Sequence, residues 1–110
     1  MGGDPADRAG SLEDVLVAVA GELEAVEVRP TAGGREWSIG GIVFAAADPE
    51  GAEFRLSRPV AAAALRTPDT APSRRGPDWV AFRPALLDRH AIDRAEAWLT
   101  SAWRRADGET

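Results

Sequence analysis

The stretch EWSIGGIVFAAADPEGAEFRL, positions 36–56, constrains the fold more than any other part of the chain. Trp37 and Ile39 alternate with polar residues, which is the two-residue period of a half-buried strand. The Gly40-Gly41 pair that follows supplies the positive φ angles required by a two-residue hairpin turn of type I′ or II′. Apolar residues resume at 42–44, and after the DPEG turn a third strand is predicted over 53–56. The stretch therefore predicts consecutive antiparallel strands.

Helices are predicted on both sides of these strands. Apolar residues recur at helical spacing over 12–25, and Ser11 with Asp14 three residues later has the spacing of a capping box, so a helix is expected there. SRPVAAAALR predicts a short helix with Pro59 at its first position and Ser57 or Arg58 as its cap. LDRHAIDRAEAWLTSAWRR, which starts at Leu87, predicts a longer helix capped by Asp88.

The remaining segments are expected to be short. VEVRP (26–30) and DWVAF (78–82) are interpreted as strands, whereas TPDTAPSRRGP (67–77) is predicted to be a loop because it holds three prolines and a glycine. We expect a flexible tail over 1–10 and a single domain over 11–106. The order of elements predicts an α+β fold: a two-layer arrangement in which an antiparallel sheet of four to six strands has N- and C-terminal helices and a short middle helix packed on one face.

Large apolar side chains define the expected core. Trp98 and Trp103 lie five residues apart, about 140° around a helix, so both cannot point at the centre, and Trp98 is expected to be the more exposed. The side chains predicted to be buried are Leu16, Val19, Trp37, Ile39, Phe44, Trp79, Leu99 and Trp103.

The residue types present leave little room for catalysis. The chain has no cysteine and no lysine, since all 13 basic residues are arginine, and His90 is its one histidine. Disulfides, thiolate chemistry and lysine Schiff bases are therefore excluded, and no metal-ligand spacing occurs. Glu36, Glu50 and Glu53 are either a general acid/base set or solubilising strand positions, and we favour the second interpretation. We expect a surface or capping role for His90, no enzymatic activity, no cofactor, no membrane partner and a cytoplasmic location.

Charge is unevenly distributed along the sequence. The formal net charge is −5, and residues 1–30 alone hold seven acids and two arginines, which gives the same −5. Six arginines against Asp69 and Asp78 give a local +4 between positions 55 and 83. We predict that any nucleic acid is bound weakly and without sequence preference by these arginines: Arg55, Arg58, Arg66, Arg74, Arg75 and Arg83. The alternative is a cleft for a small molecule or protein, lined by Trp37, Trp79 and Trp98.

Several of these motifs together resemble the MmcQ/YjbR family of small bacterial proteins. The resemblance is carried by WSIGGIVFA (37–45), FRL (54–56), LRTPD (65–69), APSRRGPDWV (71–80) and AIDRAEAWLTSAW (91–103), and spans about residues 12 to 105. It implies a compact two-layer domain, a DNA-binding function and no catalytic residue set. A second resemblance, through EFRL (53–56) and DWVAF, is to small luciferase-like domain proteins, but the histidine-rich segment of that group is missing.

Overall fold

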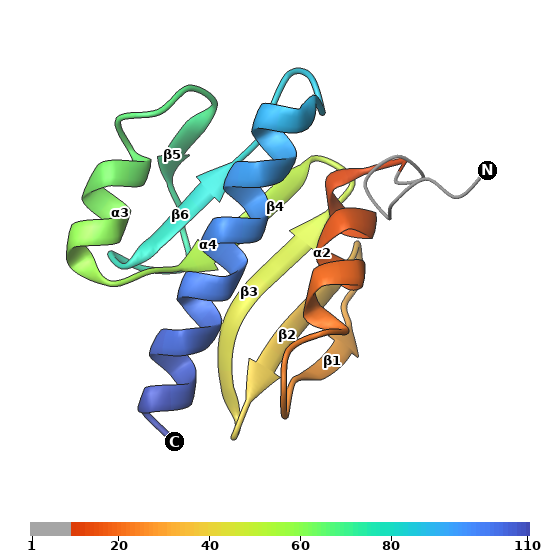
Figure 1. The fold of residues 1–110 in the computed structure, drawn as a ribbon, viewed down its shortest axis with the longest axis vertical. Helices are drawn as coiled ribbons and strands as arrows, with labels where there is room; N and C mark the ends of the chain where they lie inside the picture. The colour runs from red at the N-terminus through yellow and green to blue at the C-terminus, as the bar shows by residue number, and fades with distance from the viewer. Residues whose placement is uncertain (1–9) are drawn as a thin grey trace.

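The computed structural model of the protein describes residues 10–110 and shows one six-stranded sheet with three helices over that range (Figure 1). In chain order the elements are α2 (Leu12–Ala20), β1 (Glu27–Pro30), β2 (Arg35–Ile39), β3 (Ile42–Asp48), β4 (Gly51–Arg55), α3 (Arg58–Ala64), β5 (Thr70–Pro72), β6 (Trp79–Phe82) and α4 (Arg89–Gly108). The predicted tail falls almost entirely on residues outside the described range.

Every strand pair in the sheet is antiparallel, in the order β1-β2-β3-β4-β6-β5. Because β4 and β6 are neighbours, the chain leaves the sheet after β4, forms α3 and the edge strand β5, and returns as β6. Leu56 N–H donates to the Asp78 carbonyl where the excursion begins and ends. From α4, the Arg105 guanidinium donates to the Leu56 carbonyl (2.5 Å) and to the Asp78 carboxylate (2.9 Å), so three elements meet at this point.

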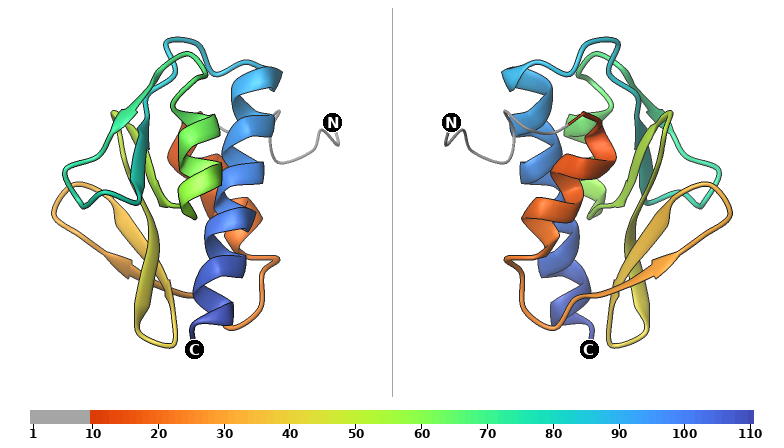
Figure 2. Two further views of the ribbon diagram at one scale, coloured as in Figure 1. Left: turned by 90° about the vertical axis from the view of Figure 1, so that its left-hand side faces the viewer. Right: turned by 90° about the vertical axis from the view of Figure 1, so that its right-hand side faces the viewer.

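All three helices lie on the same side of the sheet (Figure 2). α4 packs against β2, β3 and β4 and also against α2. No helix of the described residues covers the opposite side, which we call the open face. The predicted α+β fold is therefore confirmed, including the antiparallel sheet and the placement of the helices.

The hairpin between β2 and β3 forms as its glycines predict. Gly40 and Gly41 have φ angles of 57° and 84°, and Ile39 pairs with Ile42 across the turn. Positive φ at both central residues is the type I′ pattern, whose twist matches that of the flanking strands.

Two of the three predicted helix caps form side-chain hydrogen bonds, whereas Ser57, the N-cap of α3, forms none. The Ser11 hydroxyl accepts from Asp14 N–H (3.1 Å), and the Asp88 carboxylate accepts from Ala91 N–H (2.9 Å). The first helix is shorter than predicted, because it ends at Ala20 with Gly21 as its C-cap. The chain then turns through Ala25, whose φ is 61°, before β1 begins.

The prediction of a loop over 67–77 was wrong for Thr70–Pro72, which is β5. Asp69 and Ser73 exchange hydrogen bonds with β6, since the Asp69 carbonyl accepts from Arg83 N–H and Ser73 N–H donates to the Trp79 carbonyl. Bonded and non-bonded pairs alternate in an antiparallel ladder, so Pro72 falls at a non-bonded position. Its missing N–H therefore costs no ladder hydrogen bond, and an edge strand tolerates proline there.

The core lies between the helices and the sheet. Five of the predicted core residues are buried, namely Leu16, Trp37, Ile39, Phe44 and Leu99. Val19 and Trp103 are half-buried at its edge, and Trp103 Nε1 donates to the Glu24 carbonyl (3.0 Å).

Two predictions about tryptophan were wrong. Trp98 is the buried member of the α4 pair, only 8% exposed, because it points at the sheet between Phe54 and Phe82, with ring centroids 6.1 and 5.0 Å away. Trp79 is half-buried on the open face, because Val80 and Phe82 are the β6 residues that face the core.

No helix within residues 10–110 is long and apolar enough to cross a membrane.

Candidate functional site

A row of paired residues crosses the open face of the sheet. The register aligns Arg29 with Glu36, Glu36 with Ala46, Ala46 with Glu53, and Glu53 with Ala81. Arg29 on β1 thus lies next to Glu36 on β2, and from β2 onward glutamates on β2 and β4 alternate with alanines on β3 and β6. The small alanine side chains leave room above the sheet for a long side chain from elsewhere.

Arg75, in the loop between β5 and β6, fills part of that room. Its Nη1 lies 3.0 Å from Glu36 Oε2, and its Nε donates to Glu53 Oε1 at 3.0 Å, so one guanidinium links the two strands on either side of β3. The guanidinium carbon also lies 5.2 Å from the centroid of the Trp79 ring, which is within cation–π range. The Ser73 hydroxyl donates to the second carboxylate oxygen of Glu53. The loop is therefore held against the open face by ionic contacts.

Glu36 is the most enclosed carboxylate of this network, with a side chain 13% exposed. The hydrogen bond from Arg29 (2.5 Å), followed by that from Arg75, holds the pKa of Glu36 below its ordinary value of 4.5, although partial burial opposes the shift. A carboxylate with a lowered pKa is a weak proton acceptor. The contacts of Glu36 with Arg29 and Arg75, and of Glu53 with Arg75 and Ser73, give both glutamates ion-pairing roles, which goes beyond the predicted solubilising role.

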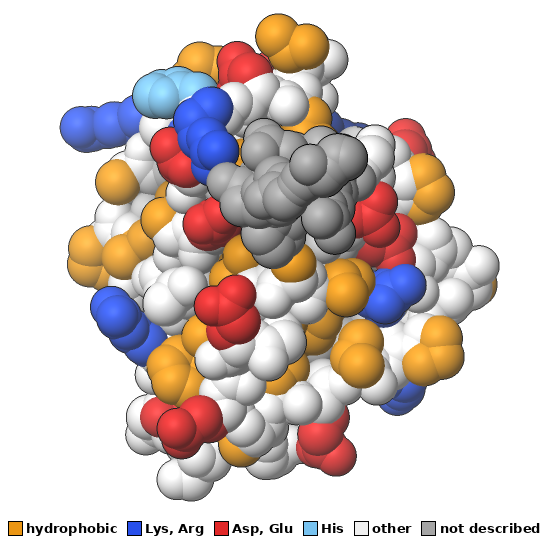
Figure 3. Space-filling view, turned by 45° about the vertical axis from the view of Figure 1, so that its right-hand side comes forward, with side chains coloured by type: hydrophobic (Ala, Val, Ile, Leu, Met, Phe, Trp, Pro, Cys, Tyr) orange, Lys and Arg blue, Asp and Glu red, His pale blue; other side chains and the backbone are white. Residues whose placement is uncertain are grey.

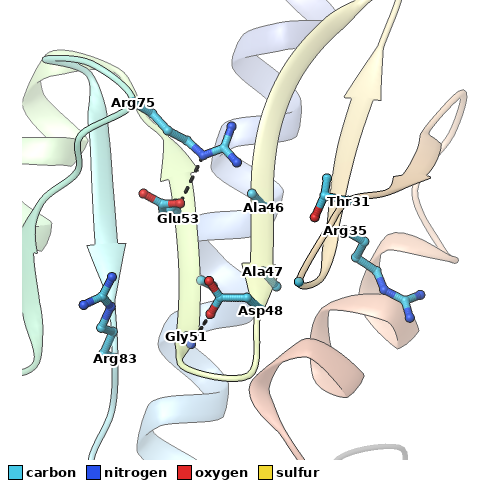
Figure 4. Close-up of a pocket in the computed structure, with 11 residues that line it drawn as sticks. Thr31, Arg35, Ala46, Ala47, Asp48, Gly51, Glu53, Arg75 and Arg83 are labelled. Carbon is cyan, nitrogen blue, oxygen red and sulfur yellow. Dashed lines mark hydrogen bonds and ion pairs between the residues drawn. The ribbon is translucent and has the colours of Figure 1, made fainter.

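A small hollow of about 100 Å³ adjoins this network (Figure 4). Asp48 closes the β3–β4 turn on one side, where its Oδ1 accepts from Glu50 N–H and Gly51 N–H. A Cβ atom on Gly51 would lie 2.4 Å from the Phe82 carbonyl oxygen, so only glycine permits this approach of β4 to β6. Arg35 points away from the hollow and donates to Glu13 on α2 (2.6 Å). The lining residues are Thr31, Gly33, Arg35, Ala46, Ala47, Asp48, Gly51, Ala52, Glu53, Arg75 and Arg83.

A larger and more open hollow, of about 820 Å³, continues from it along β5 and β6. The two hollows share Glu53, Arg75 and Arg83. Arg74 and Arg83 line the larger one, are exposed, and form no ion pair within residues 10–110. The carboxylates of Glu50, Glu53 and Asp69 lie on the same lining, so this surface carries both signs of charge.

The six predicted nucleic-acid-binding arginines do not form one free basic surface. Arg55 pairs with Glu109 at 2.5 Å, and Arg75 is held by Glu36 and Glu53. Arg58 and Arg66, at the start of α3 and just beyond its end, are exposed and have no ion pair in the described part of the chain. Figure 3 views the molecule from the helix-bearing side, where basic and acidic side chains are interspersed. The sequence showed that this segment has an excess of arginine, but not which of these arginines pair with carboxylates.

The predicted tryptophan-lined cleft is wrong. Trp37 is 2% exposed and Trp98 is 8% exposed, both within the core, whereas Trp79 lies on the other face of the sheet beneath Arg75. Consecutive residues of a strand point to opposite faces of the sheet. The register places Trp37 and Trp79 in neighbouring cross-strand rows, so their rings lie on opposite faces.

His90 is exposed at the second position of α4, consistent with the expected surface position. Within residues 10–110, no group of three or more His, Cys, Asp or Glu side chains is placed to hold a metal ion.

Thr31, Asp48 and Ser73 also belong to the site, and sequence reasoning did not select them. For Asp48 the signal was the DPEG turn, since Asp at the first position of a turn accepts from the backbone two and three residues on. Thr31 and Ser73 sit in loops whose place over the sheet depends on the strand order. Comparison of the chain with protein-family models, curated proteins and solved structures finds no match.

Proposed function

We propose that the chain is a non-catalytic module of the MmcQ/YjbR kind, acting in the cytoplasm, that binds the phosphates of nucleic acid on the open face of its sheet. The supporting observation is that Arg74 and Arg83 line one hollow and have no carboxylate partner in the described structure. A guanidinium group free of carboxylates can donate two parallel hydrogen bonds to a phosphate.

Arg75 has a positioning role in this proposal. Its bonds to Glu36 and Glu53 anchor the loop that also carries Arg74, while its own charge is matched by the two carboxylates. The acidic first turn of α2, with Glu13 and Asp14, belongs to the helical layer on the other side of the sheet. A duplex on the open face is therefore separated from those carboxylates by the sheet.

Binding of this kind is expected to be weak. A few phosphate contacts without a base-reading helix give affinities on the order of 10⁻⁴ to 10⁻⁶ M with little sequence preference. The glutamates and Asp69 on the same surface oppose a polyanion, which lowers the affinity further at low salt.

The test is a salt titration of binding to a labelled DNA duplex, followed by fluorescence anisotropy. Replacing Arg74 and Arg83 together by alanine should weaken binding similarly for all sequences. It should also reduce the slope of log K against log salt by about 1 to 2, roughly one for each lost phosphate contact.

The matched control replaces Arg58 and Arg66, which carry the same charge on the α3 side, and should keep the parental slope. Arg75 is left intact because its loss would also disturb Glu36 and Glu53. If the parent does not bind at about 20 mM salt, where phosphate contacts are strongest, or the Arg74 and Arg83 variant binds as well as the parent, the proposal is wrong.

The smaller hollow favours a second candidate, a small anionic molecule held by Thr31 and Arg83. Neither side chain has a hydrogen-bond or ion-pair partner within the described residues, and both line the hollow of about 100 Å³. A single contact of this kind gives a much weaker salt dependence than a polyanion. A change in tryptophan fluorescence on adding inorganic phosphate or a nucleotide at constant ionic strength, lost in Thr31→Ala but kept in Arg74→Ala, would distinguish it from DNA binding.

A further inference from the structure

The edge strand β1 is the most exposed element of the sheet. All four of its residues are exposed, and β2 is its one neighbour in the strand order. Val28 is 56% exposed although its register partner Trp37 is in the core, so the helical layer does not cover this end of the sheet. An uncovered edge strand presents unpaired backbone N–H and C=O groups to which another strand can add.

The register shows which backbone groups of β1 point outward. Thr31 N–H donates to the Gly34 carbonyl (2.9 Å), which makes this pair a bonded one. Since bonded and non-bonded pairs alternate, Arg29–Glu36 and Glu27–Ser38 are bonded as well, and Val28 and Pro30 direct their backbone groups away from β2. Pro30 has no N–H to offer, but its carbonyl and both polar groups of Val28 are available to a partner strand.

The side chains of β1 are complementary to themselves. If a second β1 runs antiparallel with Val28 opposite Val28, then Glu27 lies opposite Arg29 of the second copy on both sides of the centre. Val26 of one copy lies opposite Pro30 of the other. The Pro30 carbonyl needs only a donor, and the Val26 N–H of the other copy can supply it. Opposite charges directly across a strand pair stabilise it, whereas like charges destabilise it.

Charge also selects this register over its neighbours. The two β1 strands could also shift along each other while their outward-pointing backbone groups stay paired. A shift in one direction places Arg29 opposite Arg29 of the second copy, and a shift in the other direction places Glu27 opposite Glu27 of the second copy. Glu27 has no ion pair within residues 10–110, and the side chain of Arg29 is 74% exposed while it bonds Glu36, so both can take a partner.

We propose that β1 is an interface for a second copy of this chain, which pairs through an antiparallel β1–β1 contact centred on Val28. The two copies form one continuous sheet related by a two-fold axis perpendicular to it, so their helical layers lie on one side and their open faces on the other. The interface is independent of the arginines assigned to phosphate binding. It would place two such surfaces on the same side of the continuous sheet, one near each of its outer ends.

A contact through one short strand buries much less than the roughly 1,200 to 2,000 Å² of a standard stable interface, so the dimer should be weak. Sedimentation equilibrium from about 10 μM to about 1 mM should show the apparent mass rising from 11.6 kDa towards twice that value. A parent that stays monomeric at about 1 mM would overturn the proposal.

Charge variants test the register. Glu27→Arg sets an arginine against Arg29 of the second copy, and Arg29→Glu sets a glutamate against Glu27 of the second copy, so each variant alone should remain monomeric. An equimolar mixture of the two variants restores both opposite-charge pairs and should associate as the parent does. Recovery in the mixture also shows that neither variant lost association by unfolding.

Two further variants complete the test. Val28→Pro removes an N–H that points away from β2, so it should abolish association while the circular dichroism spectrum is retained. Glu50→Arg makes the same charge change as Glu27→Arg in the exposed β3–β4 turn and should leave association unchanged. Association that survives Val28→Pro, fails to recover in the mixture, or is lost equally in Glu50→Arg would refute pairing through β1.

Discussion

On the helix-bearing face of the sheet, Trp37, Phe54 and Phe82 are at most 2% exposed, whereas the same strands present Glu36, Glu53 and Ala81 on the open face. The first face buries aromatic surface against α4, and each large side chain removed from water there contributes about 1.5 to 3 kcal/mol. The second face uses ion pairs, which typically contribute about 0 to 1 kcal/mol each when partly exposed. The covered face therefore stabilises the fold, while the open face positions a loop and leaves charged groups accessible.

The largest expected difference between the faces is in tryptophan truncation. Trp37→Ala should lower the free energy of unfolding by about 3 to 5 kcal/mol, because it opens a cavity in the core. Trp79→Ala removes a half-buried ring under Arg75 and should cost only about 1 to 2 kcal/mol. Urea unfolding of both variants measures the two values. Equal losses would mean that the open face is as tightly packed as the core.

A smaller effect is expected from the ion-pair network. Glu53→Gln keeps the side-chain shape but removes the charge that binds Arg75 and Ser73, and should cost about 1 kcal/mol. It should also speed amide hydrogen exchange in the loop over residues 73–78, because the loop loses an anchor. Glu50→Gln, at an exposed turn position, is the control and should change stability by no more than about 0.5 kcal/mol. If exchange in the loop were unchanged in Glu53→Gln, the contacts of Glu53 to Arg75 and Ser73 would not be what holds the loop.

The smallest effect concerns pH. The pKa of Glu36 is lowered in the folded protein by the hydrogen bonds from Arg29 and Arg75, so the unfolded chain takes up this proton first as the pH falls. The contribution of Glu36 to stability is thus complete above about 4.5, its ordinary value, and is lost as the pH decreases through the lowered pKa. Thermal midpoints measured from pH 6 to pH 3 should fall less steeply in Glu36→Gln than in the parent. A steeper fall in the variant would contradict the assigned direction.

Local sequence signals predicted most of the fold. Gly40-Gly41, the Ser11 and Asp88 caps and the alternation in DWVAF each depend on residues within a few positions, and the structure contains all of them. β5 was missed because Pro72 within it and the turn residues that flank it are typical of a loop. Only the pairing with β6 makes it a strand.

The site was less predictable because it depends on contacts between distant segments. Arg75 meets Glu36 and Glu53 across β3, at sequence separations that no periodicity describes. Composition indicated a basic segment, yet two of its six arginines are matched by carboxylates elsewhere in the chain. The burial of Trp98 instead of Trp103 depends on how α4 is rotated over the sheet, which helical spacing alone does not determine.

The segment between Leu56 and Asp78 is joined at its two ends, and this affects how the molecule opens locally. Because Arg105 and the Leu56–Asp78 hydrogen bond fasten its two ends beside each other, the segment that holds α3 and β5 can detach without separating β4 from β6. Such a segment is expected to behave as a cooperative unit of lower stability than the rest of the sheet. Its amides should exchange together and earlier than those of β3 and β4, and the outer edge of β6 would become accessible for as long as the unit stays open.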